Sequence, residues 1–263
     1  VGEDRLKQKA VSVIGLGSFP LVQPGDDLSK LVLEAARAEG VDLEDRDVLV
    51  IAHKIVSKSE GRLLSLRAVR PSNRAKQLAL RLKRNPKLVE SILLEAKEVL
   101  AIRHRVLVVR TRIGHVCLNS GLDKSNVAGK DSYSLLPSDP DNSARRLMRQ
   151  IRKLTGKKVG VIICDTWSRP FRKGQVEFAV GVAGIDPVKD YRGRKDLFGY
   201  RLRFKYVGIA DEIASAAELV MGQGSEATPV AIVRGLEDVE WKNSSSKKLV
   251  MNERSDLFSG ALR

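Results

Sequence analysis

Val159-Gly-Val-Ile-Ile-Cys-Asp-Thr-Trp-Ser-Arg-Pro-Phe-Arg-Lys-Gly174 is the stretch around which this chain is organised. An apolar run that stops at polar residues is typical of a buried strand leading into a loop. We therefore expect Asp165-Thr166 at the end of a central strand, followed by a loop that carries Arg169, Arg172 and Lys173. A carboxylate and a hydroxyl beside several cations would suit a metal-bound, phosphate-bearing ligand. A strand-end Asp that caps a turn and pairs with Arg is an equally good interpretation of these residues alone.

Further strands and helices are expected on both sides of this stretch. Short apolar runs predict strands at 11–14, 48–52, 106–110, 116–118, 159–164, 175–183, 202–209 and 229–233. Helical periodicity and capping residues predict helices at 28–39, 72–83, 86–96, 139–154 and 211–221. We expect 112–115 to turn a hairpin and 190–201 to form a surface loop. Because strands and helices do not alternate strictly, the pattern favours an α+β fold over a doubly wound parallel sheet.

Composition limits the class of protein. The chain has 263 residues, of which 43% are hydrophobic and 30% charged, as in a globular protein of one large or two smaller domains. No membrane-spanning run or signal-peptide pattern is apparent, so we expect a cytoplasmic protein without a membrane partner. Cys117 and Cys164 lie in apolar runs and are expected to be buried thiols. The net charge of +15 fits nucleic-acid binding, a polyanionic small substrate or simply a basic surface.

Three polar loops contain oxygen ligands of the kind that Mg²⁺ or Mn²⁺ prefers. These ligands are Asp123, Asp165 with Thr166, and Gln223, although each is an ordinary turn residue when taken alone. The glycine-bearing segment 221–228 offers backbone amides for phosphate, or equally glycines that end a helix. The sequence contains no Walker A loop, nucleophile elbow or dinucleotide-binding fingerprint.

Seven stretches, in order, resemble one known family, coenzyme F420-0:L-glutamate ligase, in its stand-alone archaeal form. The stretches are 19–27 (FPLVQPGDD), 56–62 (VSKSEGR), 119–126 (NSGLDKSN), 165–174 (DTWSRPFRKG), 189–199 (KDYRGRKDLFG), 210–214 (ADEIA) and 221–224 (MGQG). Each is weak alone, and their order and spacing together are specific. The resemblance extends over 11–236 and leaves 1–10 and 237–263 as polar extensions.

The resemblance implies a fold, a reaction and partners. The fold would be a two-domain α+β subunit, with two intertwined subdomains and mixed or antiparallel sheets flanked by helices. The reaction would use GTP to join L-glutamate to F420-0 through an amide bond, releasing GDP and phosphate by way of an acyl phosphate. Two divalent ions, Mg²⁺ or Mn²⁺, would assist, and a need for K⁺ is left open. The protein would be a homodimer with its active site near the interface.

The resemblance also assigns roles to individual residues. Asp123 and Asp165 would hold one metal ion, and Thr166 and Gln223 would help to hold the second. Asp123 and Asp165 would be catalytic. To these we add the hypothesis that Arg169, Arg172 and Lys173 steer the phosphates or the F420-0 phosphodiester, which would make Arg169 and Arg172 catalytic as well. The GTP pocket would be lined by Phe19, Pro20, Leu21, Val22, His53, Lys54, Lys58, Asn126, Met221, Gly222, Gln223, Gly224, Ser225, Glu226, Ala227 and Thr228.

The chain also departs from the family pattern. Gln223 stands where some relatives have an acid, His53-Lys54 replaces small hydroxyl residues, and Trp167-Ser168 replaces a glycine-bearing turn. These departures bear on guanine contacts and acceptor preference more than on the type of reaction. Two other functions stay open: a related nucleotide-dependent amino-acid ligase with another carboxylate acceptor, and a basic nucleic-acid-binding protein without the activity. Nucleic acid is the less favoured partner, because the metal- and phosphate-binding residues are intact in type.

Overall fold

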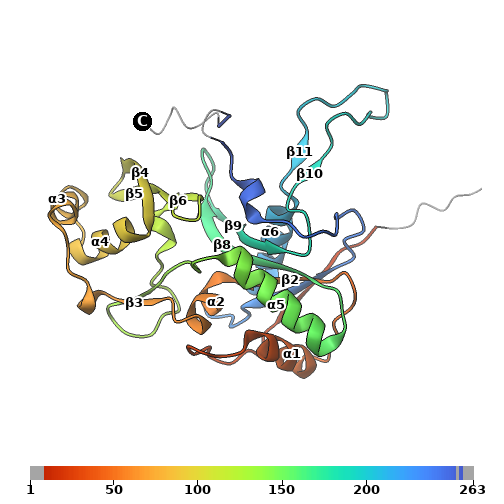
Figure 1. Cartoon of the computed structure of the whole chain (residues 1–263), viewed down its shortest axis with the longest axis horizontal. Helices are drawn as coiled ribbons and strands as arrows, with labels where there is room; N and C mark the ends of the chain where they lie inside the picture. Colours follow the sequence, from red (N-terminus) through yellow and green to blue (C-terminus); the bar gives the residue numbers. More distant parts are fainter. Residues whose placement is uncertain (1–8, 253–254, 257–263) are drawn as a thin grey trace, which may run out of the picture.

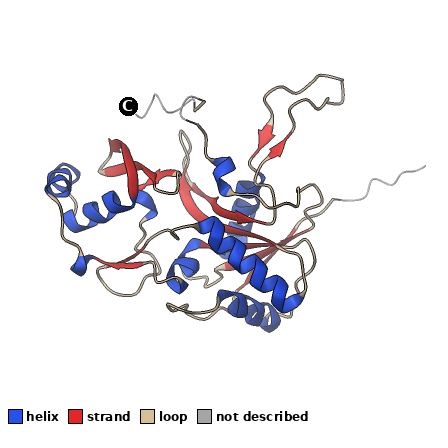
Figure 2. Cartoon of the chain, in the orientation of Figure 1, coloured by secondary structure: helices blue, strands red, loops and turns tan. Residues whose placement is uncertain are grey.

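The quoted stretch forms β8 (Gly160–Ser168), which lies inside a five-stranded sheet in the larger of two lobes (Figures 1 and 2). The computed structural model describes residues 9–252 and 255–256. The strand order is β1 (Ser12–Leu16), β12 (Val230–Arg234), β2 (Val48–Ala52), β8 and β9 (Gln175–Ala183). Only β2 and β8 are parallel, and the other neighbours are antiparallel. The sheet is therefore mixed, and the fold is α+β, as predicted.

Helices cover both faces of this sheet. α1 (Leu28–Ala38) and α5 (Pro140–Thr155) pack on one face, and α6 (Ile209–Met221) packs on the other. Alternate residues of β2 point into the two cores, since side chains alternate across a strand. A strand buried on both faces needs an uninterrupted apolar sequence, which explains the runs at 48–52 and 159–164.

A smaller lobe is inserted between α2 (His53–Ser59) and α5, and it has a core of its own. Its helical elements are η1 (Leu66–Ala68), α3 (Asn73–Leu82), α4 (Pro86–Glu95) and η2 (Asn119–Gly121). Its strands are β3 (Leu63–Ser65), β4 (Ala96–Arg103), β5 (Val106–Thr111), β6 (Val116–Leu118) and β7 (Ser132–Ser134). β4, β5 and β6 form one antiparallel sheet, and β3 pairs with β7.

One predicted strand, 202–209, is wrong. Only Tyr206–Val207 (β11) pairs, with Lys189–Asp190 (β10), and α6 begins at Ile209. The residues between β10 and β11 form an arm that projects from the larger lobe (Figure 1). The alternating apolar residues of the arm have no core to pack against, and Phe204 is 86% exposed. The alternation of apolar and polar residues in 202–209 therefore did not produce a long strand, because no larger sheet lies beside this segment in the described structure.

Other elements also differ from the prediction. β8 does not end before Asp165 but continues to Ser168, because β9 pairs with it along this whole length. The helix that begins at Pro86 ends at Glu95, and Ala96 opens the unpredicted strand β4. The short helix α2, which starts at His53, was not predicted either.

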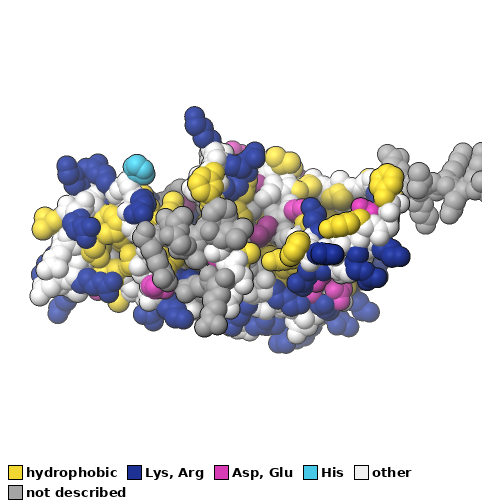
Figure 3. Space-filling model, turned by 90° about the horizontal axis from the view of Figure 1, so that it is seen from above, with side chains coloured by type: hydrophobic (Ala, Val, Ile, Leu, Met, Phe, Trp, Pro, Cys, Tyr) yellow, Lys and Arg dark blue, Asp and Glu magenta, His cyan; other side chains and the backbone are white. Residues whose placement is uncertain are grey.

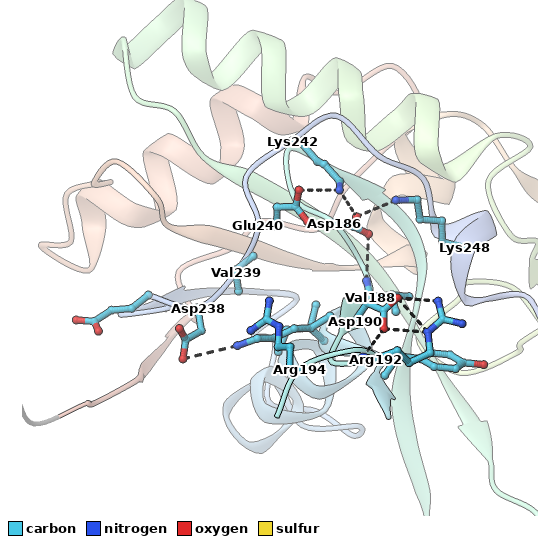
Figure 4. A pocket seen from close by; sticks show the side chains of 14 residues that line it. Asp186, Val188, Asp190, Arg192, Arg194, Asp238, Val239, Glu240, Lys242 and Lys248 are labelled. Atoms are coloured by element: carbon cyan, nitrogen blue, oxygen red, sulfur yellow. Dashed lines mark hydrogen bonds and ion pairs between the residues drawn. The ribbon is translucent and has the colours of Figure 1, made fainter. Parts of the chain in front are cut away.

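The C-terminal segment 237–250 packs on the larger lobe despite its polar composition. Val239 and Ser246, the first residue of η3 (Ser246–Leu249), are buried. Lys242 and Lys248 both form ion pairs with the buried carboxylate of Asp186, as Figure 4 shows. Of the predicted terminal extensions, residues 1–8, 253–254 and 257–263 lie outside the described part of the chain. No helix among the described residues is long and apolar enough to cross a membrane.

Candidate functional site

A cavity of about 840 Å³ opens where β2 ends and the polar half of β8 begins. Its size lies within the range of small-molecule and cofactor sites. It is lined by segments far apart in the sequence, namely 19–23, 52–55, Lys58, 63–65, 126–128, Ser132, 164–166, Glu177 and 221–229. Every residue that the sequence assigned to the GTP pocket is among them.

Two consecutive residues at the start of α2 contact the two predicted metal-binding aspartates. His53 Nε2 lies 3.2 Å from Asp165 Oδ1, although the two atoms are not aligned for a hydrogen bond. Lys54 Nζ forms an ion pair of 2.7 Å with Asp123 Oδ2. Burial by itself would raise the pKa of Asp123, but the hydrogen bonds from Lys54 and Ser125 outweigh it and lower that pKa. Asp123 is therefore an anion paired with Lys54, which lines the cavity, although Asp123 itself is not among the lining residues.

Asp165 is fixed more tightly than Asp123. Its side chain is buried and accepts hydrogen bonds from the Thr166 amide (2.9 Å) and from Trp167 Nε1 (2.7 Å). The Trp167 ring packs in turn against Phe178 and His115. Packing that locks the aromatic donor also locks the carboxylate, as a preorganised binding group requires.

Thr166 lies opposite Glu177 in the β8–β9 ladder, and the two side chains meet Gln223 at the end of α6. Thr166 Oγ1 is 2.6 Å from Glu177 Oε1 and 2.9 Å from Gln223 Oε1. Gln223 Nε2 donates to Glu177 Oε1 at 3.0 Å. Burial raises the pKa of Glu177, and the hydrogen bonds from Thr166 and Gln223 only partly oppose this.

The segment 221–228 forms the wall of the cavity after α6. Gly222 has φ +66°, a left-handed conformation that suits glycine, and it ends the helix. The Gly224 amide donates to Glu226 Oε2 at 2.7 Å, and the Gly224 carbonyl accepts from Asn126 Nδ2 at 3.1 Å. The helix-ending role predicted for these glycines is therefore confirmed for Gly222, whereas the Gly224 amide is paired with the chain's own Glu226.

The predicted cations divide into two groups. Lys54 and Lys58 line the cavity, and burial together with the charge of Lys54 lowers the pKa of Lys58. Arg169, Arg172 and Lys173 instead lie at the tip of the β8–β9 hairpin and are not among the residues that line the cavity. Arg169 Nη2 donates to the Lys173 carbonyl at 3.0 Å, which closes the hairpin turn.

The donor set of the site fits a divalent ion that also takes ligands from a substrate. Among residues 9–252 and 255–256, no three His, Cys, Asp or Glu side chains form a group that could hold a metal ion by themselves. Mg²⁺ is usually bound by one or two carboxylates plus substrate phosphates, not by a cage made entirely of protein groups. Asp123, Asp165, Thr166 and Gln223 supply oxygen atoms of this kind, and the buried Glu177 Oε2 has no hydrogen-bond partner.

A second cavity, of about 700 Å³, lies between the base of the arm and the C-terminal segment (Figure 4). Its charged side chains neutralise one another: Asp186 pairs with Lys242 and Lys248, and Asp190 pairs with Arg192. Arg194 lies over the Tyr191 ring. Because these charges are already compensated, this cavity is a weaker candidate for an anionic ligand than the first.

Sequence reasoning missed several residues of the site. Glu177 was read only as part of an apolar strand, and Leu63–Ser65 and Val127–Ala128 were not considered. A glutamate within a run of buried residues was the one available signal for Glu177, because carboxylates are rarely buried without a partner. No local signal distinguishes the other residues from ordinary loop and strand positions.

Comparison with known proteins gives concordant matches. A model of the family described as F420-0:Gamma-glutamyl ligase matches residues 17–235. The chain is 44% identical to the coenzyme F420:L-glutamate ligase of Methanothermobacter thermautotrophicus, over 95% of this chain and 99% of that protein. It is 48% identical to the enzyme of that name from Methanopyrus kandleri, over 82% and 83% of the two chains. Its identity to the Archaeoglobus fulgidus enzyme is 42%, over 96% and 98%.

Proposed function

Because this chain belongs to the F420-0:Gamma-glutamyl ligase family, we propose that it is a ligase that joins L-glutamate to coenzyme F420-0 with GTP as the energy source. The observation that carries the proposal is the cavity at the end of β2 and the polar half of β8. It brings Asp165, Thr166 and Gln223 together with the glycine-bearing wall 221–228 and the two lysines of α2. These groups are an acid, neutral oxygen ligands, a glycine-bearing turn and cations, which a reaction between a nucleotide and a carboxylate requires.

The chemistry of the reaction explains why the site contains both acidic and basic side chains. A carboxylate is a poor electrophile, so the acceptor must first be activated, and we propose that it attacks the γ-phosphate of GTP to give an acyl phosphate. The glutamate amine then forms the amide bond by displacing phosphate. Phosphoryl transfer depends mainly on positioning and electrostatic stabilisation and needs no nucleophilic side chain. The one thiol that lines the described cavity, Cys164, has a pKa raised by burial and is therefore a poor nucleophile.

The residues of this chain have distinct parts in that proposal. Lys54 and Lys58 attract and neutralise the phosphates, and the wall 221–228, whose Gly224 amide donates to Glu226, would border the nucleotide. Asp123 and Asp165 would hold one divalent ion, while Thr166 and Gln223 would contribute to a second. Such ions supply charge neutralisation at the transferred phosphoryl group. Trp167 keeps Asp165 in place, through the hydrogen bond described above.

The net charge of +15 supports polyanionic substrates. On the face seen in Figure 3, Lys and Arg side chains gather at both ends and along the lower edge, and acidic side chains are sparse. A positive surface raises the association rate of anionic ligands such as GTP and a phosphodiester-containing coenzyme.

GDP release from GTP is the direct test. The protein is incubated with Mg²⁺ or Mn²⁺ and L-glutamate, with and without F420-0, and the product is examined by mass spectrometry. We expect GDP release that requires both substrates, together with an F420 species heavier by one glutamate. Asp123→Asn is the preferred inactive variant, because Asp165→Asn would leave one of the buried Thr166 and Trp167 donors without an acceptor. Glu212→Gln, at an exposed position of α6, is the matched active control.

Two other functions make different predictions in the same assay. Amide formation on another carboxylate, without turnover of F420-0, would indicate a related ligase. Folded protein with no GTP turnover and with salt-dependent RNA or DNA binding would indicate a nucleic-acid-binding protein.

We also propose that the protein is a homodimer, as its family membership leads us to expect. Leu197 and Phe198 at the arm are 99% and 96% exposed, which is unusual for large apolar side chains of a monomer. Light scattering after size-exclusion chromatography tests the proposal. A mass near 58 kDa, twice the 29.0 kDa of the chain, is expected, and a mass near 29 kDa at assay concentration contradicts it.

A further inference from the structure

We propose that Glu177 is the anionic ligand of the divalent ion to which Thr166 and Gln223 contribute. The inference rests on the proposed function, since it concerns the same cavity. It adds a residue to which sequence reasoning gave no role. Thr166 and Gln223 are both neutral, so neither can offset the charge of a divalent ion, and Glu177 is the carboxylate that both of them contact.

The two oxygens of Glu177 have very different surroundings. Oε1 accepts hydrogen bonds from Thr166 and Gln223, whereas Oε2 is buried and has no hydrogen-bond partner within residues 9–252 and 255–256. The Cys164 thiol lies close enough to oppose the rise in the pKa of Glu177. Its single hydrogen, however, is donated to the Ile51 carbonyl at 3.6 Å. The residue as a whole is 5% exposed. A carboxylate that only supported the fold would have partners for both oxygens, because an unpartnered buried polar atom is costly.

Three oxygen atoms converge at this point. Thr166 Oγ1 is 2.6 Å from Glu177 Oε1 and 2.9 Å from Gln223 Oε1, and the threonine hydroxyl has one hydrogen to share between them. Neighbouring oxygen ligands of an octahedral Mg²⁺ site lie about 3 Å apart, since each is about 2.1 Å from the ion. The three oxygens are therefore close together, and the single hydroxyl hydrogen cannot serve both of the contacts of Thr166. Such a group of oxygens is suited to binding a hard cation.

The backbone fixes this arrangement rather than leaving it to flexible side chains. Thr166 and Glu177 are direct partners across the antiparallel β8–β9 pair, so their side chains are on the same face. A register shift between Ile163 and Cys164 sets which residue of β9 faces Thr166. Gln223 reaches the pair from the end of α6, which packs on β9.

Binding of Mn²⁺ by the full chain tests the proposal. Free Mn²⁺ is measured by electron paramagnetic resonance during titration of metal-free protein, with and without a GTP analogue whose β–γ bridge is an imido group. We expect Glu177→Gln to weaken nucleotide-dependent Mn²⁺ binding at least tenfold, as loss of groups that support a metal site commonly does. Glu218→Gln is the matched control. Like Glu177, this half-buried carboxylate raises the pKa of Cys164, but it forms no hydrogen bond with Thr166 or Gln223 in the described part of the chain. We therefore expect its replacement to leave the Mn²⁺ affinity unchanged.

A variant that moves the carboxylate from position 177 to position 223 distinguishes a metal ligand from a residue that only supports the fold. Glu177→Gln combined with Gln223→Glu keeps one carboxylate in the group and should restore most of the lost Mn²⁺ affinity. Wild-type affinity in Glu177→Gln, or no recovery in a double variant that folds, as judged by thermal unfolding, would overturn the assignment of Glu177. If the wild-type protein binds the GTP analogue without binding Mn²⁺, both this inference and the proposed metal-assisted reaction are refuted. If Glu177→Gln alone is unaffected, only the present inference fails.

Discussion

Replacement of Asp211 by Asn is predicted to stabilise the protein at neutral pH. Asp211 lies in the first turn of α6, and its Oδ1 accepts a hydrogen bond from the Ala179 amide at 2.9 Å. Ala179 belongs to β9, an edge strand of the sheet, so Asp211 satisfies a backbone donor that has no strand partner. An asparagine oxygen can accept the same hydrogen bond without carrying a charge.

The magnitude follows from the pKa of Asp211. Burial raises this pKa to about 6 from an ordinary value of 3.8, although the Ala179 amide partly opposes the shift. The raised pKa means that ionised Asp211 destabilises the folded chain: the penalty is absent below about pH 4 and complete above about pH 6. A shift of about two pKa units corresponds to about 3 kcal/mol. The favourable position of a carboxylate near a helix N-terminus offsets up to about 1 kcal/mol, leaving about 2–3 kcal/mol.

Urea unfolding of the wild type and Asp211→Asn at pH 4 and pH 8 measures this effect. The two proteins should have similar free energies of unfolding at pH 4, and the variant should be about 2–3 kcal/mol more stable at pH 8. Glu212→Gln, an exposed acid in the same helical turn, should show no such gain. A stability difference between wild type and Asp211→Asn that is the same at both pH values would refute the reasoning, because the effect depends on ionisation of Asp211.

Three further predictions concern packing and the site. Gly181→Ala should destabilise the fold by about 1–3 kcal/mol, because a Cβ there would lie 2.5 Å from the Pro140 backbone. An unchanged midpoint of denaturant unfolding would contradict this. Lys54→Met should raise the pKa of Asp123 and so move the acid limb of kcat/KM to higher pH, and an unmoved limb would separate Asp123 from catalysis. Arg172→Ala should lower kcat/KM without lowering Tm if Arg172 steers phosphates or the phosphodiester from the hairpin tip, and unchanged kinetics would remove that role.

Most elements of the fold could be predicted from the sequence, because their causes are local. Asp27, Ser72 and Asp139 each cap the helix that follows, as their side chains suggested. The apolar runs at 48–52 and 175–183 became strands with the predicted bounds. The prediction at 202–209 failed because its cause is not local. Alternation of apolar and polar residues is a local property, but a strand also needs a neighbouring strand. This segment has one for only two residues, Tyr206–Val207.

The sequence by itself therefore determined the α+β class and, through the order and spacing of its motifs, the family. Only the tertiary structure brought Glu177 to Thr166 and Gln223, which are separated from each other by 57 positions along the chain. The register of β8 against β9 decides this, since a slip of one residue would turn Glu177 to the opposite face of the sheet. Register depends on the cores packed on both faces and on the irregularity at Ile163 and Cys164, and no residue near Glu177 encodes either one.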